Sequence, residues 1–162
     1  MRTSGTALIT LPTDTQILVT REFDAPKHLV YKAFTTPALI KRWWSGGMGE
    51  VTSAEVDLRV GGSWRYVMNA DGGFEVAFHG EYREVVEAER VVCTEVFEGM
   101  PEGDSQPTVC TYTFTETDRR TTLSLLIECG NQGLRDTVLE SGMETGMEAG
   151  FKLLEQIAIE LD

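Results

Sequence analysis

Positive charge is scarce in this sequence and is nowhere concentrated. Its 162 residues include 14 Lys and Arg against 26 Asp and Glu, a formal net charge of −12. Proteins bind nucleic acids and anionic membranes largely by neutralising phosphates with Lys and Arg. Long apolar runs are also missing, and none approaches the roughly 20 residues that span a bilayer. We therefore expect no nucleic-acid partner and no membrane span.

Cysteine is equally sparse. The three cysteines, Cys93, Cys110 and Cys129, are odd in number, far apart and without a Cys-x-x-Cys pair. Such spacing indicates neither a disulfide framework nor a zinc site, so we expect buried, inert thiols in a reducing cytoplasm. The apolar stretch at residues 7–9 is too short for a signal peptide, which favours the same cytoplasmic location.

Only two histidines are present, and both fall off the predicted apolar faces. His28 lies in the first turn of a predicted helix whose apolar stripe skips it, and His79 alternates off an aromatic strand face. We expect both at the surface. The sequence therefore assigns no catalytic residue, no metal ligand and no cofactor.

The pattern of apolar residues predicts a single α+β domain over residues 1–162. Extended pieces at 8–11 and 17–23 flank turn-forming residues and predict a hairpin. Two short helices are expected next, starting at Asp24-Ala25-Pro26 and at Thr36-Pro37. Period-two alternation from 51 to 128 then predicts an antiparallel meander, which we expect to curve around the final helix.

Residues 134–161 contain no proline and predict one long helix. Its apolar face carries leucine, isoleucine and methionine, while the glutamates are expected to meet solvent: Glu140, Glu144, Glu148 and Glu155. Gly142, Gly146 and Gly150 fall on the apolar side. Because glycine weakens a helix, we expect these three to leave space between the helix and the sheet.

Five short segments resemble a known family when taken in order. They are residues 21–26 (REFDAP), 37–44 (PALIKRWW), 56–64 (VDLRVGGSW), 80–82 (GEY) and 141–146 (SGMETG). Together they resemble the START-like, or SRPBCC, superfamily, and within it the group similar to the activator of the ninety-kilodalton heat-shock chaperone's ATPase (AHSA-like). The resemblance implies a helix-grip fold whose cavity, between sheet and final helix, holds a hydrophobic or amphipathic small molecule.

The sequence departs at two points from the pattern of many members of the family that it resembles. Ser45-Gly46-Gly47 replaces a Gly-Pro pair, which predicts a more mobile loop. Met147 replaces a tryptophan after Gly146, which predicts a more deformable cavity wall. The relatives that act as chaperone activators carry an additional amino-terminal domain, for which this sequence has no room.

Candidate cavity residues are aromatic or methionine side chains on predicted inner faces. The predicted walls are Trp64, Tyr66, Phe74, Phe78, Met143, Met147 and Phe151, with Trp44 at the rim. Ordinary core packing is the alternative for each of them. The wall interpretation rests on the accompanying glycines, including Gly80, which prevent even filling of the interior.

Arg21 is the candidate for polar recognition, since it shares parity with Ile17, Val19 and Phe23 on one strand face. An inward guanidinium needs either a carboxylate partner or an anionic ligand group. Asp57 and Arg59 instead predict a surface ion pair beside a hairpin turn.

Three hypotheses about function stay open at this point. The first is binding of a hydrophobic or amphipathic small molecule, such as a lipid or polyketide. The second is a cyclase- or hydrolase-like enzyme, for which Tyr66 and Tyr82 are the inward candidates. The third is a stress-related interaction with a chaperone through the acidic surface. A second copy of the chain is a further possible partner.

Overall fold

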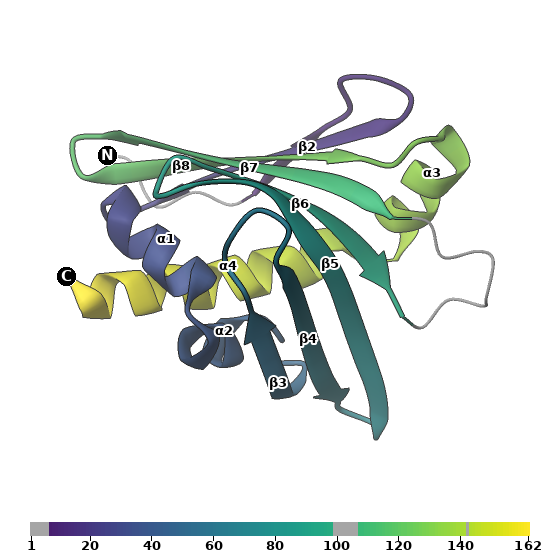
Figure 1. Cartoon of the computed structure of the whole chain (residues 1–162), viewed down its shortest axis with the longest axis horizontal. Helices are drawn as coiled ribbons and strands as arrows, with labels where there is room; N and C mark the ends of the chain where they lie inside the picture. The colour runs from purple at the N-terminus through teal and green to yellow at the C-terminus, as the bar shows by residue number, and fades with distance from the viewer. Residues whose placement is uncertain (1–6, 99–106, 142) are drawn as a thin grey trace.

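The computed structural model describes residues 7–98, 107–141 and 143–162, which form an α+β fold (Figure 1). The strands are β1 (Leu8–Thr10), β2 (Gln16–Phe23), β3 (Gly49–Val56), β4 (Ser63–Ala70), β5 (Phe74–Val86), β6 (Arg90–Phe97), β7 (Thr108–Thr117) and β8 (Arg120–Glu128). The helices are α1 (Lys27–Thr35), α2 (Pro37–Trp43), α3 (Gln132–Glu140) and α4 (Met143–Leu161). Figure 1 shows the curved sheet arching over α4, as the helix-grip prediction requires.

All eight strands belong to one antiparallel sheet in the order β1-β2-β8-β7-β6-β5-β4-β3. The predicted hairpin is confirmed as β1 and β2, and the predicted meander as β3 to β8. Strand β2 shows why the sheet has one inner face, since Ile17, Val19, Arg21 and Phe23 are buried while the residues between them are half-buried. This alternation matches the period of an extended chain and directs every second side chain toward α4.

The two predicted short helices are confirmed as α1 and α2. Pro37 is the first residue of α2, where its missing N–H leaves no intrahelical partner unsatisfied. Trp43 closes this helix and is buried, and its indole N–H donates a hydrogen bond of 2.8 Å to the carbonyl of Ala33 in α1. That bond fixes the two helices to each other.

The prediction of a single helix over residues 134–161 is wrong. The structure has two helices there, because α3 ends at Glu140 and α4 begins at Met143. At the end of α3 both the amide and the hydroxyl of Ser141 donate to the carbonyl of Val138. A serine that bonds locally to the backbone competes with helix continuation. Gly142, which was expected to face the sheet, lies outside the described residues.

The other glycines provide close contact rather than open space, which corrects their predicted role. A Cβ on Gly150 would lie 3.1 Å from the carbonyl oxygen of Trp43, and one on Gly146 would lie 3.2 Å from Cε of Met48. These glycines let the end of α2 and the following loop approach α4. A Cβ on Gly80 would overlap the backbone carbonyl of Thr94 on the neighbouring strand β6.

Candidate functional site

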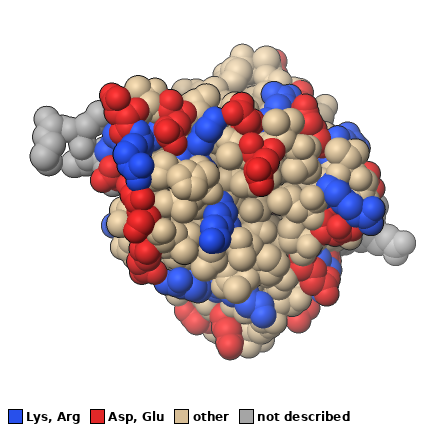
Figure 2. Space-filling view, turned by 60° about the vertical axis from the view of Figure 1, so that its left-hand side comes forward, with Lys and Arg blue, Asp and Glu red and all other residues tan. Residues whose placement is uncertain are grey.

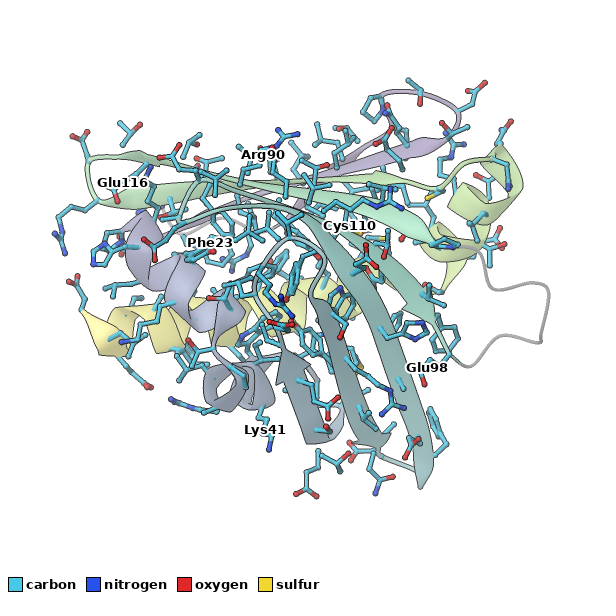
Figure 3. The ribbon with its side chains drawn as sticks, in the orientation of Figure 1. Phe23, Lys41, Arg90, Glu98, Cys110 and Glu116 are labelled. Atoms are coloured by element: carbon cyan, nitrogen blue, oxygen red, sulfur yellow. The ribbon has the colours of Figure 1, made fainter. Side chains whose placement is uncertain are left out.

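Strands β4 to β7 carry a cluster of polar side chains on the sheet face that is turned toward α4. Its members are Tyr66, Tyr82, Cys93, Glu95, Cys110 and Tyr112, and we call it the inner polar cluster. Strand register explains the grouping, because Tyr82 pairs with Cys93 and Cys93 pairs with Cys110. Figure 3 labels Cys110 on the same side of the sheet as the core residue Phe23, and Arg90 on the opposite side.

Members of the inner polar cluster interact with one another. The thiol of Cys110 donates to Oε2 of Glu95 across 3.3 Å. The hydroxyls of Tyr66 and Tyr82 lie close enough to influence each other's pKa. The bond from Cys110 satisfies part, but not all, of the hydrogen-bonding capacity of the cluster.

Burial governs the protonation of the inner polar cluster. Desolvation raises the pKa of the phenols, and that of Tyr66 and Tyr112 lies well above the ordinary value. Desolvation also raises the pKa of Cys93 to about 12 and that of Cys110 well above 9. The phenols and thiols are therefore protonated at neutral pH and act as hydrogen-bond donors rather than as bases.

Glu95 is the one carboxyl group in this cluster. Desolvation raises its pKa, and the hydrogen bond from Cys110 opposes that increase. Its position was not singled out in the sequence, although a signal was present: Glu95 shares parity with the inward residues Val91 and Cys93 on β6. An acidic residue continuing an apolar strand face identifies an inward charge.

Glu95 and Tyr112 also border accessible space. Both residues belong to the inner face and are desolvated, yet neither is fully buried. Oε1 of Glu95 and the Tyr112 hydroxyl have no hydrogen-bond partner in the described part of the chain, and neither atom is sealed from solvent. Together these observations indicate a space on the inner side of the sheet that water reaches.

A row of aromatic rings leads from this inner face to the edge of the molecule. Ring centroids lie 4.8 Å apart for Trp64–Tyr66, 5.5 Å for Tyr66–Trp44, 5.7 Å for Trp44–Phe78 and 5.0 Å for Phe78–Phe97. Trp64 is buried, Trp44 and Phe78 are half-buried and Phe97 is exposed. The structure thus brings four of the predicted site residues together: Trp44, Trp64, Tyr66 and Phe78.

Phe74, which was expected on the same inner face, is 59% exposed. It is the first residue of β5, directly after the turn at residues 71–73, where the β4–β5 hairpin extends beyond the helices (Figure 1). Strand parity alone could not show this, because an inward side chain is buried only where another element covers it.

The predicted residues of α4 divide into two groups. Phe151 is 4% exposed and makes an edge-to-face contact with Phe23 of β2, with centroids 5.7 Å apart. Met143 and Met147, in the first turns of α4, are half-buried and contact the core. The methionines therefore keep accessible surface, whereas Phe151 packs in the core.

Arg21 has carboxylate partners. It is 4% exposed, and its guanidinium pairs with Oε1 of Glu148 at 2.9 Å and Oε1 of Glu155 at 3.6 Å. The other oxygen of Glu155 accepts the amide of Asp24 at 2.8 Å. Of the two partners that the sequence allowed for Arg21, a carboxylate or an anionic ligand, the structure contains the carboxylate.

This ion pair corrects the prediction that the glutamates of α4 meet solvent. Glu140 and Glu144 are exposed as expected, but Glu155 is 6% exposed and Glu148 is half-buried. Glu148 and Glu155 are seven residues apart, which is two helical turns, so both face β2. Glutamates that face solvent and glutamates that face the sheet recur at the same helical spacing. What distinguishes the two cases here is the buried partner Arg21, which the spacing does not reveal.

The surface predictions are confirmed. His28 and His79 are exposed, and His79 Nδ1 lies 2.8 Å from a carboxylate oxygen of Glu98. Asp57 and Arg59 form an exposed pair at 2.9 Å, although both lie in the loop after β3 rather than on the strand. The three cysteines are buried and free.

Two hollows lie outside the inner face. The first, of about 340 Å³, is on the outer side of the sheet and is lined by Ser63, His79, Gly80, Glu81, Arg83, Thr94, Val96 and Pro107. The second, of about 610 Å³, lies beside α4 and is lined by Ala7, Glu144, Thr145, Glu148, Ala149 and Lys152. Among the described residues, no group of three or more His, Cys, Asp or Glu is arranged to hold a metal ion.

No helix in the described ranges has the length and apolar character needed to cross a membrane.

The fold itself is widely shared by solved structures. A protein from Rhodobacter sphaeroides is similar with a TM-score of 0.88 at 21% identity, covering 96% of this chain and 99% of that one. A Nitrosomonas europaea protein gives 0.82 at 22%, covering 93% and 98%. A Mycobacterium smegmatis protein gives 0.82 at 24%, covering 96% and 97%.

At these identities the solved structures show the fold alone. No curated protein matches the chain. A family model does, and it spans most of the elements described above: the model for activator of Hsp90 ATPase homolog 1-like protein matches residues 24–158. The chain therefore belongs to the family of activator of Hsp90 ATPase homolog 1-like proteins.

Proposed function

We propose that this protein binds a hydrophobic or amphipathic small molecule between the sheet and α4. The observation that carries the proposal is the accessible inner surface at Glu95 and Tyr112. Small-molecule sites are mostly apolar hollows with a few convergent polar groups, and the inner polar cluster supplies such groups.

The aromatic row supports the same proposal. Trp44 and Phe78 are half-buried and lie between the buried ring of Trp64 and the exposed ring of Phe97. Rings of this kind give an apolar ligand a continuous contact surface from the molecular edge inward. Met143 and Met147 on α4 offer flexible apolar surface that adapts to the shape of a ligand.

Native mass spectrometry of gently purified protein, followed by denaturing extraction, tests whether a small molecule is bound. A neutral fluorescent probe, N-phenyl-1-naphthylamine, gives an independent titration. Met147→Trp adds bulk at a half-buried position of α4, and we expect it to weaken probe binding at least about fivefold because it fills accessible space.

Ile159→Trp is the matched control, since it makes a similar change on the same helix at a side chain that is 48% exposed. We expect this variant to bind the probe like the unmodified protein. Equal probe binding by both variants, or no binding by any of them, would contradict a site between sheet and helix.

Interaction with a chaperone is the second candidate function, and the family description is the observation that favours it. The net charge of −12 offers a basic partner long-range attraction. Figure 2, however, shows acidic and basic residues interspersed over the face in view. Strong weakening of partner binding by salt would favour this surface role, whereas insensitivity to salt would favour the inner site.

A further inference from the structure

We infer that the inner site selects an amphipathic amine, with Glu95 accepting hydrogen bonds from the ligand's cationic end, and that it disfavours carboxylates and phosphates. The inference rests on the proposed function and names the chemical class of its ligand. It follows from three features of the inner polar cluster: the kind of groups present, the charges around them, and the atoms left open.

The first feature is the chemical type of the groups. The cluster contains one carboxyl, three phenols and two thiols, and none of its members is Lys, Arg or His. An anionic ligand end in a partly desolvated site requires a positive charge to balance it. A cationic end requires a carboxylate, and Glu95 is the carboxyl on this face.

The second feature is the set of charges that act on these groups. Two carboxyl groups act electrostatically on the phenols and thiols: Glu95 acts on four of them, and Asp57 acts on Tyr82. Arg21 is the inward guanidinium of β2, and it is already paired with Glu148 and Glu155. The field at the inner polar cluster thus attracts positive charge and repels negative charge.

The third feature is the acceptor capacity of Glu95. A carboxylate offers about four acceptor positions on its two oxygens. Within the described residues, the side chain of Glu95 receives one hydrogen bond, from the thiol of Cys110, which is a weak donor. Its Oε1 is open to the inner space, as is the hydroxyl of Tyr112. A primary ammonium has three donors and matches these open acceptors.

Three probes with the same twelve-carbon chain test this inference: dodecylamine, dodecanol and dodecanoate. Each is used below its micelle concentration, at neutral pH, to displace N-phenyl-1-naphthylamine from the full chain. We expect dodecylamine to displace the probe at a concentration at least about tenfold lower than dodecanoate. The reason is that the ammonium end is positively charged and the carboxylate end is negatively charged.

Glu95→Gln removes the charge with little change of shape. We expect the preference for amine over carboxylate to fall to about threefold or less in this variant, with dodecanol unchanged. Since the chain is acidic overall, an amine is also attracted to its outer surface. Glu81→Gln, which removes an exposed carboxylate from β5, is therefore the matched control. Titration at about 150 mM salt screens the attraction to the surface.

The outcomes separate the inference from the function it rests on. Binding of dodecanoate as tightly as dodecylamine, or an unchanged amine preference in Glu95→Gln, overturns the inference and leaves the binding function standing. An equal loss of preference in Glu81→Gln and Glu95→Gln also overturns it, because the selectivity would then come from net charge. Failure of N-phenyl-1-naphthylamine and dodecanol to bind overturns the inference together with the proposed function.

Discussion

Single carboxyl groups have opposite environments on the two sides of this sheet. On the inner side, desolvation raises the pKa of Glu95. On the outer side, Glu98 accepts two hydrogen bonds of 2.9 Å from Arg65 and lies beside His79, and its pKa falls to about 2. Burial thus disfavours the carboxylate form on the inner face, whereas hydrogen bonds from nearby cations stabilise it on the outer face.

The pair formed by Glu98 and Arg65 predicts a pH-dependent contribution to stability. A carboxyl whose pKa is lowered on folding stabilises the fold above its ordinary pKa of 4.5, and this contribution is lost as pH falls toward 2. Glu98→Gln should therefore destabilise the protein at pH 6, by less than about 1 kcal/mol because solvent screens the pair. The difference should shrink between pH 4.5 and pH 2.

Urea unfolding of both proteins at pH 6, 4 and 3 measures this effect. Glu50→Gln, at an exposed carboxyl of β3, serves as the control and should show no such convergence. A destabilisation by Glu98→Gln that stays constant over the whole pH range would refute the assignment.

At the scale of secondary-structure elements, the ion pair of Arg21 joins β2 to α4. Both Glu148 and Glu155 belong to α4, and Glu155 also accepts the amide of Asp24 directly after β2. Arg21→Met should lower the free energy of unfolding by about 3 kcal/mol, because it leaves the buried carboxylate of Glu155 without its cation.

Chemical denaturation followed by circular dichroism measures that change. Arg42→Met is the control, since Arg42 pairs with Glu160 where both side chains are more than half exposed. It should cost less than about 1 kcal/mol. If Arg21→Met destabilised the protein as little as Arg42→Met, the pair would not hold the helix to the sheet.

The contact between β5 and β6 gives another prediction for this scale. Trp64 donates its indole N–H to the carbonyl of Thr94 at 3.1 Å, beside the position that a side chain on Gly80 would fill. Gly80→Ala should therefore destabilise the protein by about 2 kcal/mol through overpacking.

Thermal unfolding of Gly80→Ala and Gly133→Ala distinguishes this steric effect from a general effect of alanine. Gly133 lies in α3 with only the side chain of Asn131 nearby, so its change should be neutral or stabilising. Equal melting temperatures for the two variants would argue against the steric explanation.

The sequence predicts those features of an element that are caused by residues close together in the chain, and it misses those that depend on distant residues. Alternation in β2 and the proline of α2 are local signals, and both predictions are confirmed. The break between α3 and α4 was missed because no proline marks it, and a lone serine is only a weak stop signal in a sequence, although in the structure Ser141 bonds to Val138. The burial of Glu155 was missed because it depends on Arg21, which lies far away in the sequence.

The candidate site shows the same division. Parity alone placed Trp64 and Tyr66 on one face, and the structure confirms that they touch. Parity also places Glu95 on the inner face, but a single charged residue on an apolar face does not identify a site until its neighbours are known. Those neighbours come from β7, whose register against β6 no sequence pattern fixes.

At the scale of the whole molecule, one sheet wraps one long helix, and α1 and α2 close the side between them (Figure 1). This architecture leaves a concave inner face that is covered by α4 rather than by a second sheet. A single helix covers less of a curved sheet than another sheet would, which is the geometric reason for accessible space over the inner polar cluster.

The pairing of β2 with β8 determines when this molecule is able to fold. Gln16 and Glu128, which face each other across the two strands, are 112 positions apart. During synthesis the apolar row of β2 therefore emerges from the ribosome long before its partner strand exists, and the helix that covers both follows later still. Closing such a distant pairing is slow, and unpaired apolar strands aggregate. The order in which the chain is translated thus differs from the order in which its sheet is assembled. The core cannot form until the last third of the chain has been synthesised.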